Sequence, residues 1–296
     1  MRNIIINSIY DLMKKNKKIF FLTADMGINL VEKFQKKYSN RYLNVGISEQ
    51  NLIGVAAGLC KIGYKPFLYT ISNFLIHRCF EQIRNDIVLH NLPITLIGTS
   101  TGFDNASLGP THHVIDDWGP LKSFPEIDIY CPSSKKYSEN IIKKILTNKR
   151  PSYIRIPKGS FEKIKTNNDY YYLNAGSQKI ILVSYGYGAE ICFDIFKSKN
   201  ISSLILNKLH PLKQNLILNI LKKYNKTIVF EDQMQNNNLH GSLAKLLIKN
   251  KKKINLIGLA PKYYEVKNGN SKEFYLKKHK IDKESILRLL KNLYRI

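Results

Sequence analysis

Residues 44–59 read NVGISEQNLIGVAAGL, a turn that leads into a helix rich in small residues. Ser48 is placed to cap this helix, because a serine oxygen can accept a hydrogen bond from a backbone N–H of the first turn. Glu49 then falls in that first turn, where the helix dipole favours a negative charge. Gly54 and Gly58 leave room for another backbone to approach closely. The stretch therefore predicts a helix with a carboxylate at its start, although a first-turn glutamate taken alone is typical of an ordinary surface position.

The same alternation of short apolar runs and helical segments continues along the first half of the chain. The predicted strands are Ile19–Thr23, Pro66–Ile71, Ile94–Thr99, Ile127–Cys131 and Ser152–Ile156. The predicted helices between them are Gln50–Ile62, Phe74–His90 and Ser134–Leu146. This alternation predicts a mostly parallel sheet that is covered by helices on both faces.

A polar, tyrosine-rich segment without a clear period, Thr166–Gly176, separates this series from a second one. The second series has predicted strands at Lys179–Ser184, Ser203–Leu206, Thr227–Glu231 and Ile254–Leu259. Its predicted helices are Ala189–Ser198, Leu212–Tyr224, Leu239–Lys249 and Lys283–Tyr294. We therefore predict two doubly wound α/β domains with mostly parallel sheets, residues 1–165 and 179–296, joined by a linker at 166–178.

The net charge of the chain is +25, from 47 basic and 22 acidic residues. Clustered Lys and Arg bind phosphate, so nucleic-acid binding has to be considered. The lysines, however, are scattered in short runs such as Lys251–Lys253, and the chain carries no nucleic-acid-binding motif. A compositional bias toward Asn, Ile, Tyr and Lys explains the charge equally well. We expect no nucleic-acid partner, while an acidic protein partner or an anionic substrate remains compatible with the charge.

No apolar run is long enough to span a bilayer, and the first residues lack the pattern of a signal peptide. We therefore expect a cytoplasmic protein with no membrane contact. The four cysteines form no CxxC pair, and each lies in an apolar stretch, which predicts buried free thiols rather than a zinc site or disulfides. They are Cys60, Cys79, Cys131 and Cys192.

A second motif, Gly109-Pro110-Thr111-His112-His113, ends the glycine-rich loop that follows the predicted strand Ile94–Thr99. Open α/β sheets bind ligands in loops at the carboxyl ends of their strands. Adjacent histidines supply donors, acceptors and proton-transfer groups near neutral pH. A metal site is not indicated, because neighbouring residues rarely converge on one ion. Taken alone, the motif is equally typical of a loop with incidental histidines.

Taken together and in this order, several segments resemble the pyrimidine-binding domain of transketolases, and they are also similar to 1-deoxyxylulose-5-phosphate synthases. These segments are Thr23–Gly27, Arg41–Asn51, Phe74–Arg84, Gly109–His113 and Ile154–Gly159. More loosely, Val229–Asp232 and Leu239–Leu243 resemble the C-terminal domain of the same family. The resemblance implies a transferase that uses thiamine diphosphate and is active only with a partner subunit.

The resemblance also implies roles at a cofactor site. The glutamate that matches Glu49 hydrogen-bonds a ring nitrogen of the aminopyrimidine and favours its imino tautomer. That tautomer takes the proton from the thiazolium carbon, and the cofactor then carries the carbanion chemistry. Phe74 matches the aromatic residue that stacks on the aminopyrimidine, although its helical position is also typical of core packing. Ile47 is assigned to the same cofactor site.

Three further residues are assigned to the substrate by the resemblance. His112 matches a histidine near the reactive carbon, and Arg78 falls near the substrate channel or the subunit interface. Lys158 stands where relatives often carry an Arg for a substrate phosphate; a lysine binds phosphate as a point charge without the bidentate fork, and an exposed surface lysine is the alternative. Leu108 stands where relatives commonly have an Asp that contacts a sugar hydroxyl, so the donor is left open.

The magnesium and diphosphate motif of the family, Gly-Asp-Gly with a downstream Asn, does not occur in this sequence. In full-length transketolases it lies N-terminal to the pyrimidine-binding domain. The resemblance therefore implies a split enzyme, in which an N-terminal transketolase subunit brings the Mg²⁺ ligands and the diphosphate site. Self-association would then give a heterotetramer, and no metal ligands are expected in this chain.

The leading hypothesis is the transfer of a two-carbon ketol unit between small-molecule sugars or sugar phosphates. A pyruvate-decarboxylating synthase of the deoxyxylulose-phosphate type is the second. A beta subunit of a 2-oxo acid dehydrogenase is the third, and the Gly-Pro-Thr-His segment argues against it. A non-catalytic scaffold relative is the fourth, and the presence of Glu49 and His112 argues against that one.

Overall fold

The computed structural model describes residues 1–159, 161–176, 179–235, 238–264 and 269–294. The chain divides into two compact units, and each is built on its own β-sheet. The first unit comprises residues 1–100, 121–167 and 208–211, and the second comprises 101–120, 168–207 and 212–296. The predicted fold class, two α/β domains with mostly parallel sheets, is confirmed.

The sheet of the first unit has seven strands, in the order β10-β5-β6-β4-β3-β1-β2. All of its neighbours are parallel except β10, which pairs antiparallel with β5. The register places Tyr69, Ile97, Ile154 and Tyr130 in one row across four strands. The strands are β1 (Ile19–Thr23), β2 (Tyr42–Asn44), β3 (Lys65–Ile71), β4 (Thr95–Thr99), β5 (Asp128–Tyr130), β6 (Ser152–Ile156) and β10 (Lys208–His210).

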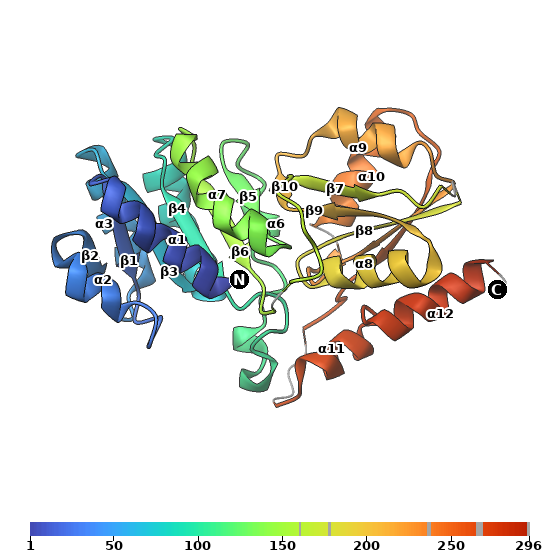
Figure 1. Ribbon diagram of the computed structural model, residues 1–296, viewed down its shortest axis with the longest axis horizontal. Helices are drawn as coiled ribbons and strands as arrows, with labels where there is room; N and C mark the ends of the chain where they lie inside the picture. The colour runs from blue at the N-terminus through green and yellow to red at the C-terminus, as the bar shows by residue number, and fades with distance from the viewer. Residues whose placement is uncertain (160, 177–178, 236–237, 265–268, 295–296) are drawn as a thin grey trace. The chain divides into compact units, whose positions relative to one another are not determined.

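Helices bury both faces of this sheet. On one face, α1 (Arg2–Lys15) and α7 (Lys135–Thr147) lie side by side (Figure 1). Their apolar residues form one core cluster with Phe34 of α2 (Glu32–Lys37) and with Phe21 and Tyr69 of the sheet. Successive strand residues point to opposite faces, so Leu22 and Leu68 face away from this cluster, yet they are also fully buried. There α3 (Glu49–Lys61) packs against β3.

The predicted helix Phe74–His90 is wrong as a continuous element. The segment forms α4 (Ser72–Ile76), α5 (Phe80–Gln82) and a π-helical turn, η2 (Ile83–Val88). Its apolar residues Ile83 and Ile87 are buried as the helical period suggested. The backbone hydrogen bonds of one continuous helix are not formed, however. The helix is interrupted between α4 and α5, where Arg78 lies in a turn.

The second unit contains a five-stranded sheet in the order β12-β11-β8-β9-β7. Four of its strands are parallel and were predicted: β8 (Ile180–Tyr185), β9 (Ser202–Leu206), β11 (Lys226–Phe230) and β12 (Asn255–Leu259). The fifth, β7 (Tyr170–Leu173), lies in the segment predicted as a linker and pairs antiparallel with β9. Residues 177–178 of that predicted linker lie outside the described residues.

Helices again flank this sheet, with α8 (Gly188–Lys199) on one side and α9 (Gln214–Leu221) and α10 (Leu239–Lys249) on the other (Figure 1). Two further helices follow, α11 (Lys272–Lys278) and α12 (Lys283–Tyr294). Residues 101–120 follow β4 along the chain but belong to the second unit. They contain two 3-10 turns, η3 (Ala106–Leu108) and η4 (Pro110–His112), and the start of α6 (Trp118–Leu121).

Two whole-chain features were also expected from the sequence. Within the described residues, no helix combines the length and the apolar character that crossing a bilayer requires. The four cysteines are free, and three of them are buried, whereas Cys60 is half-buried.

Candidate functional site

The predicted cofactor residues of the first unit gather at the carboxyl edge of its parallel sheet. Glu49 follows β2, and Phe74 and Arg78 follow β3. Lys158 follows β6 at the same edge. Because ligands of open α/β sheets bind beyond the carboxyl ends of the strands, this edge is the candidate site.

A tight turn delivers Glu49 to this edge. The side-chain oxygen of Asn44 accepts hydrogen bonds from the backbone N–H groups of Asp25 and Gly46, at 2.9 and 3.0 Å. Gly46 has a φ of +74°, a conformation that glycine adopts without strain. Ser48 occupies the N-cap position, but the predicted side-chain cap is wrong, because its hydroxyl donates to the carbonyl of Val45 at 2.7 Å. The hydroxyl therefore bonds a carbonyl of the preceding turn and not a backbone N–H of the helix.

Glu49 is a buried carboxylate with a charged partner. It is 2% exposed, and its Oε2 lies 2.9 Å from Nη1 of Arg78. The side chain of Arg78 is 44% exposed, so the pair reaches from the protein interior to the surface. Gln50 donates a hydrogen bond to the carbonyl of Arg78 at 2.9 Å, which links the turn between α4 and α5 to the start of α3. The carboxylate is therefore desolvated but paired.

Arg78 also covers an aromatic face. Its guanidinium carbon lies 4.5 Å from the ring centre of Phe74, within cation–π range. The next residue, Cys79, donates to the carbonyl of Phe74 at 3.5 Å. Burial, and secondarily the charge of Glu49, raise the pKa of the Cys79 thiol to about 12, so this sulfur stays neutral. The structure thus brings together Glu49, Phe74 and Arg78 from the sequence prediction.

The chemistry of this cluster fits the pyrimidine end of thiamine diphosphate. The guanidinium of Arg78 is flat and rich in N–H groups, and it contacts the aromatic face and the buried carboxylate at once. A flat nitrogen heterocycle can make the same two kinds of contact, stacking on Phe74 and sharing a proton with Glu49. Among the described residues, no group of three or more His, Cys, Asp or Glu side chains gathers to hold a metal ion.

Two other predicted residues of the first unit lie at the same edge. Ile47 lies in the turn before α3, and its side chain is 78% exposed. Lys158 lies two residues beyond β6 and is exposed. Both positions are open to a ligand approaching from solvent.

His112 lies in the second unit, at the end of η4. Its backbone N–H bonds the carbonyl of Gly109 at 3.0 Å, and its Nδ1 lies 3.0 Å from the hydroxyl of Thr111. Leu108, in the preceding turn, is 58% exposed. The neighbouring His113 is 1% exposed and packs on aromatic rings. The structure therefore separates the two adjacent histidines, one half-buried and one enclosed in the core.

A buried acid of the second unit was not among the predicted site residues. Glu231 is 1% exposed and accepts hydrogen bonds from the Tyr185 hydroxyl and from the backbone N–H groups of Leu239 and His240. Burial raises its pKa to about 7 despite these donors. The available signal was its position at the end of a predicted strand and before a predicted helix, a place where parallel sheets collect polar groups.

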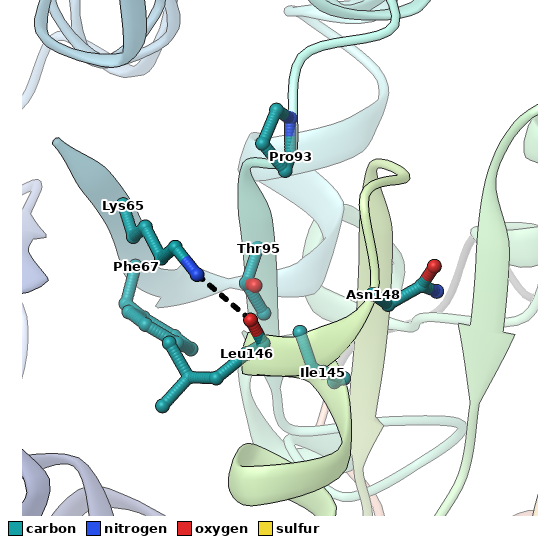
Figure 2. Close-up of a pocket in the computed structure, with 7 residues that line it drawn as sticks. All are labelled: Lys65, Phe67, Pro93, Thr95, Ile145, Leu146 and Asn148. Atoms are coloured by element: carbon teal, nitrogen blue, oxygen red, sulfur yellow. Dashed lines mark hydrogen bonds between the residues drawn. The ribbon is translucent and has the colours of Figure 1, made fainter. Parts of the chain in front are cut away.

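A small, open pocket lies at the opposite edge of the first sheet, where β3 and β4 begin (Figure 2). Lys65 points into it and donates to the carbonyl of Leu146 at 2.8 Å. The rest of its lining is mostly apolar, from Phe67, Pro93 and Ile145. It contains none of the predicted site residues.

Three relatives of known family resemble the chain over different lengths. It is similar to a 1-deoxy-D-xylulose-5-phosphate synthase of Halothermothrix orenii, with 30% identity over 235 residues, which are 75% of this chain and 36% of that protein. It is 28% identical to a putative transketolase C-terminal section of Methanocaldococcus jannaschii, with 94% of this chain and 91% of the relative covered. It is also 28% identical to an apulose-4-phosphate transketolase subunit of Actinobacillus succinogenes, with 99% and 98% covered.

The chain thus spans only about a third of the synthase but nearly the whole length of the two transketolase relatives. A solved structure titled "Split gene transketolase, inactive beta4 tetramer" shares the fold, with a TM-score of 0.86 at 22% identity over 99% of this chain and 97% of that one. The family model "Transketolase, pyrimidine binding domain" matches residues 1–163, more than half of the chain. With this match over the residues that form the Glu49 cluster, the chain belongs to the transketolase pyrimidine-binding domain family.

Proposed function

We propose that this chain is the C-terminal subunit of a split, thiamine diphosphate-dependent transketolase-like enzyme that transfers a two-carbon ketol unit between sugars or sugar phosphates. The observation that carries the proposal is the buried carboxylate of Glu49, held beside the ring of Phe74 by their shared contact with Arg78. The near full-length similarity to two proteins named as parts of transketolases supports it.

In this proposal Glu49 holds a proton at the pyrimidine ring nitrogen, and Phe74 stacks on the ring. Ile47, exposed in the turn before α3, lines the same site. When bound, thiamine diphosphate supplies a nucleophilic carbon that carries the ketol unit. Because Arg78 contacts both Glu49 and Phe74, its side chain has to move aside before a ring can take this place.

The substrate is proposed to meet three cationic or proton-transfer groups. His112 is assigned to the reacting carbon, where its imidazole ring supplies hydrogen-bonding and proton-transfer groups. Arg78, once displaced from Glu49, and the exposed Lys158 are assigned to anionic groups of the substrate, the lysine as a point charge.

A partner subunit is proposed to complete the cofactor site. It is an N-terminal transketolase subunit that carries the Mg²⁺ ligands and the diphosphate-binding residues, and the relatives named as a C-terminal section and as a subunit support this division. The complete enzyme is proposed to be a heterotetramer.

A pyruvate-decarboxylating synthase is the second candidate. It is favoured by the 30% identity to a 1-deoxy-D-xylulose-5-phosphate synthase. Substrate profiling separates the two candidates. Consumption of pyruvate with release of carbon dioxide, and no ketol transfer, would establish the synthase activity.

The proposal is tested by reconstituting the chain with a partner that carries the Gly-Asp-Gly motif. Glu49→Gln is expected to abolish turnover, because an amide cannot share a proton with the ring nitrogen in the same way. The matched control is Glu190→Gln, a first-turn glutamate of α8 in the second unit, which is expected to leave turnover unchanged. Full activity of Glu49→Gln would refute the assigned chemistry, and tight thiamine diphosphate binding by the chain alone would refute the split site.

A further inference from the structure

The loop that carries His112 is closed at its base. Gly102 and Val114 form an isolated antiparallel bridge, with N–H to carbonyl distances of 2.9 and 2.7 Å. Between them, η3 and η4 fold the loop into two consecutive tight turns. Compact surface loops have their ends close together in this way. The position of His112 therefore depends on what holds the base.

Aromatic packing holds both ends of the loop on α11. Phe103 stacks on Tyr275, with ring centres 5.1 Å apart and planes 11° apart. His113, at the other end, meets the same Tyr275 ring edge-on at 4.7 Å. All three side chains are at most 1% exposed. One ring of α11 thus fixes the residue after Gly102 and the residue directly after His112.

An ion pair joins the same loop to the same face of α11. Lys272 lies 2.5 Å from Oδ1 of Asp104. The Asp104 side chain is fully buried, and the Lys272 side chain is 25% exposed. Lys272 and Tyr275 are three residues apart, so they project from one side of the helix. The hydroxyl of Thr101 adds a longer contact to Asp104 at 3.5 Å.

We propose that α11 is the positioning element for His112, with Tyr275 and Lys272 as positioning residues for the substrate-binding step. The proposal rests on the function proposed above, in which His112 meets the substrate. It assigns a task to α11: holding the substrate loop in place. Neither Tyr275 nor Lys272 touches the reacting atoms in this account. They act through Phe103, Asp104 and His113.

The physical reason is that catalysis depends steeply on placement. A misplacement of a catalytic group by about 1 Å can cost up to about 100-fold in rate. His113 is bonded directly to His112, so a change in the packing of His113 on Tyr275 is passed on to the catalytic residue. Loss of the Lys272 cation leaves a buried carboxylate without that partner, which favours an opened loop in which Asp104 reaches water.

The first test is hydrogen exchange on the purified full chain. Lys272→Met is expected to speed amide exchange in residues 103–113 by at least about tenfold. Lys272→Arg, which keeps the cation, is expected to retain the protection of the wild type. The matched control is Lys283→Met, which breaks a more exposed ion pair of α12 with Asp194, at 3.0 Å, and is expected to leave this loop unchanged. Unchanged loop exchange in Lys272→Met would overturn the proposal.

The second test uses the reconstituted holoenzyme. Lys272→Met is expected to raise KM for the ketol donor, or lower kcat, by between about 10- and 100-fold. Its affinity for thiamine diphosphate, measured by calorimetry, is expected to stay unchanged, because Glu49 and Phe74 belong to the first unit. A parallel loss of cofactor affinity would mark Lys272 as merely structural and overturn the proposal. If the wild-type holoenzyme transfers no ketol unit, the proposed function fails, while the exchange experiment still decides whether α11 holds the loop.

Discussion

Arg78 joins Glu49 through a charged contact, with Nη1 2.9 Å from Oε2, and the same guanidinium lies over the ring of Phe74. The two contacts are of the kinds proposed for the aminopyrimidine of the cofactor, one to a buried carboxylate and one to an aromatic face. The arginine therefore compensates the charge of Glu49 in this structure. Any ring that is to stack on Phe74 competes with it.

Replacement of this arginine tests the competition. Arg78→Met is expected to tighten thiamine diphosphate binding to the reconstituted complex by up to about tenfold, a modest effect because the arginine is nearly half exposed and its ion pair is screened by solvent. Calorimetric titration measures it. Arg84→Met is the matched control, at an exposed position where the guanidinium donates to Asn85 at 2.8 Å. Weaker cofactor binding in Arg78→Met would contradict the competition and favour a direct role of Arg78 in holding the cofactor.

Glu231 predicts a pH dependence of stability. Its pKa in the folded chain is about 7, against an ordinary value of 4.5, so the folded state holds a proton that the unfolded state releases between these values. Glu231 therefore contributes up to about 3 kcal/mol to the free energy of unfolding. This contribution is complete below about pH 4.5 and is lost as the pH rises to about 7. Urea unfolding of the chain from about pH 5 to about pH 8 measures the trend.

Two variants isolate the contribution of Glu231. Glu231→Gln cannot titrate, so the fall in stability over this range is expected to flatten. Glu284→Gln, at an exposed position in the first turn of α12, is expected to keep the wild-type profile. An unchanged profile in Glu231→Gln would assign the pH dependence to another group.

Gly102 predicts a steric requirement at the base of the His112 loop. Its φ is +58°, and a Cβ at this position would overlap the carboxylate of the buried Asp232. Gly102→Ala is expected to lower the free energy of unfolding by roughly 1–3 kcal/mol. The matched control is Gly54→Ala in α3, where a Cβ meets no atom within 4 Å and helix propensity favours alanine by about 1 kcal/mol. Equal effects of the two substitutions in denaturant titrations would contradict this steric account.

The cysteines predict an order of chemical reactivity. The thiolate is the reactive form, and burial raises the pKa of Cys79 to about 12, whereas Cys60 is only half-buried. A maleimide at neutral pH is therefore expected to label Cys60 first in the native chain. Mass spectrometry of the labelled peptides identifies the site, and Cys60→Ser is expected to remove the fast phase. Early labelling of Cys79 would show that the contacts around Phe74 open readily.

The local features of the site were predictable from the sequence. A glycine turn, a helix of small apolar residues and a carboxylate at its start place Glu49 in the first turn of α3, as observed. Buried parallel strands are short, continuous apolar runs, so β1, β3, β4 and β6 were recognised close to their observed bounds. The hydroxyl partner of Ser48 was not predictable, because two backbone partners lie nearby and residue type does not choose between them.

Other features depend on contacts between residues far apart in the chain. The short strands β7 and β10 exist because β9 and β5 offer them an antiparallel edge, and neither segment carries a strong strand pattern of its own. The apolar period of residues 74–90 predicted one helix, but the helix is interrupted at Arg78, whose guanidinium is bound to Glu49. By itself, the sequence determined the alternation of elements and the position of Glu49, since both follow from propensity and period within a few residues. Only the tertiary structure decided that Arg78 pairs with Glu49 and that α11 contacts the His112 loop, because burial and charge pairing act between residues that the sequence keeps apart.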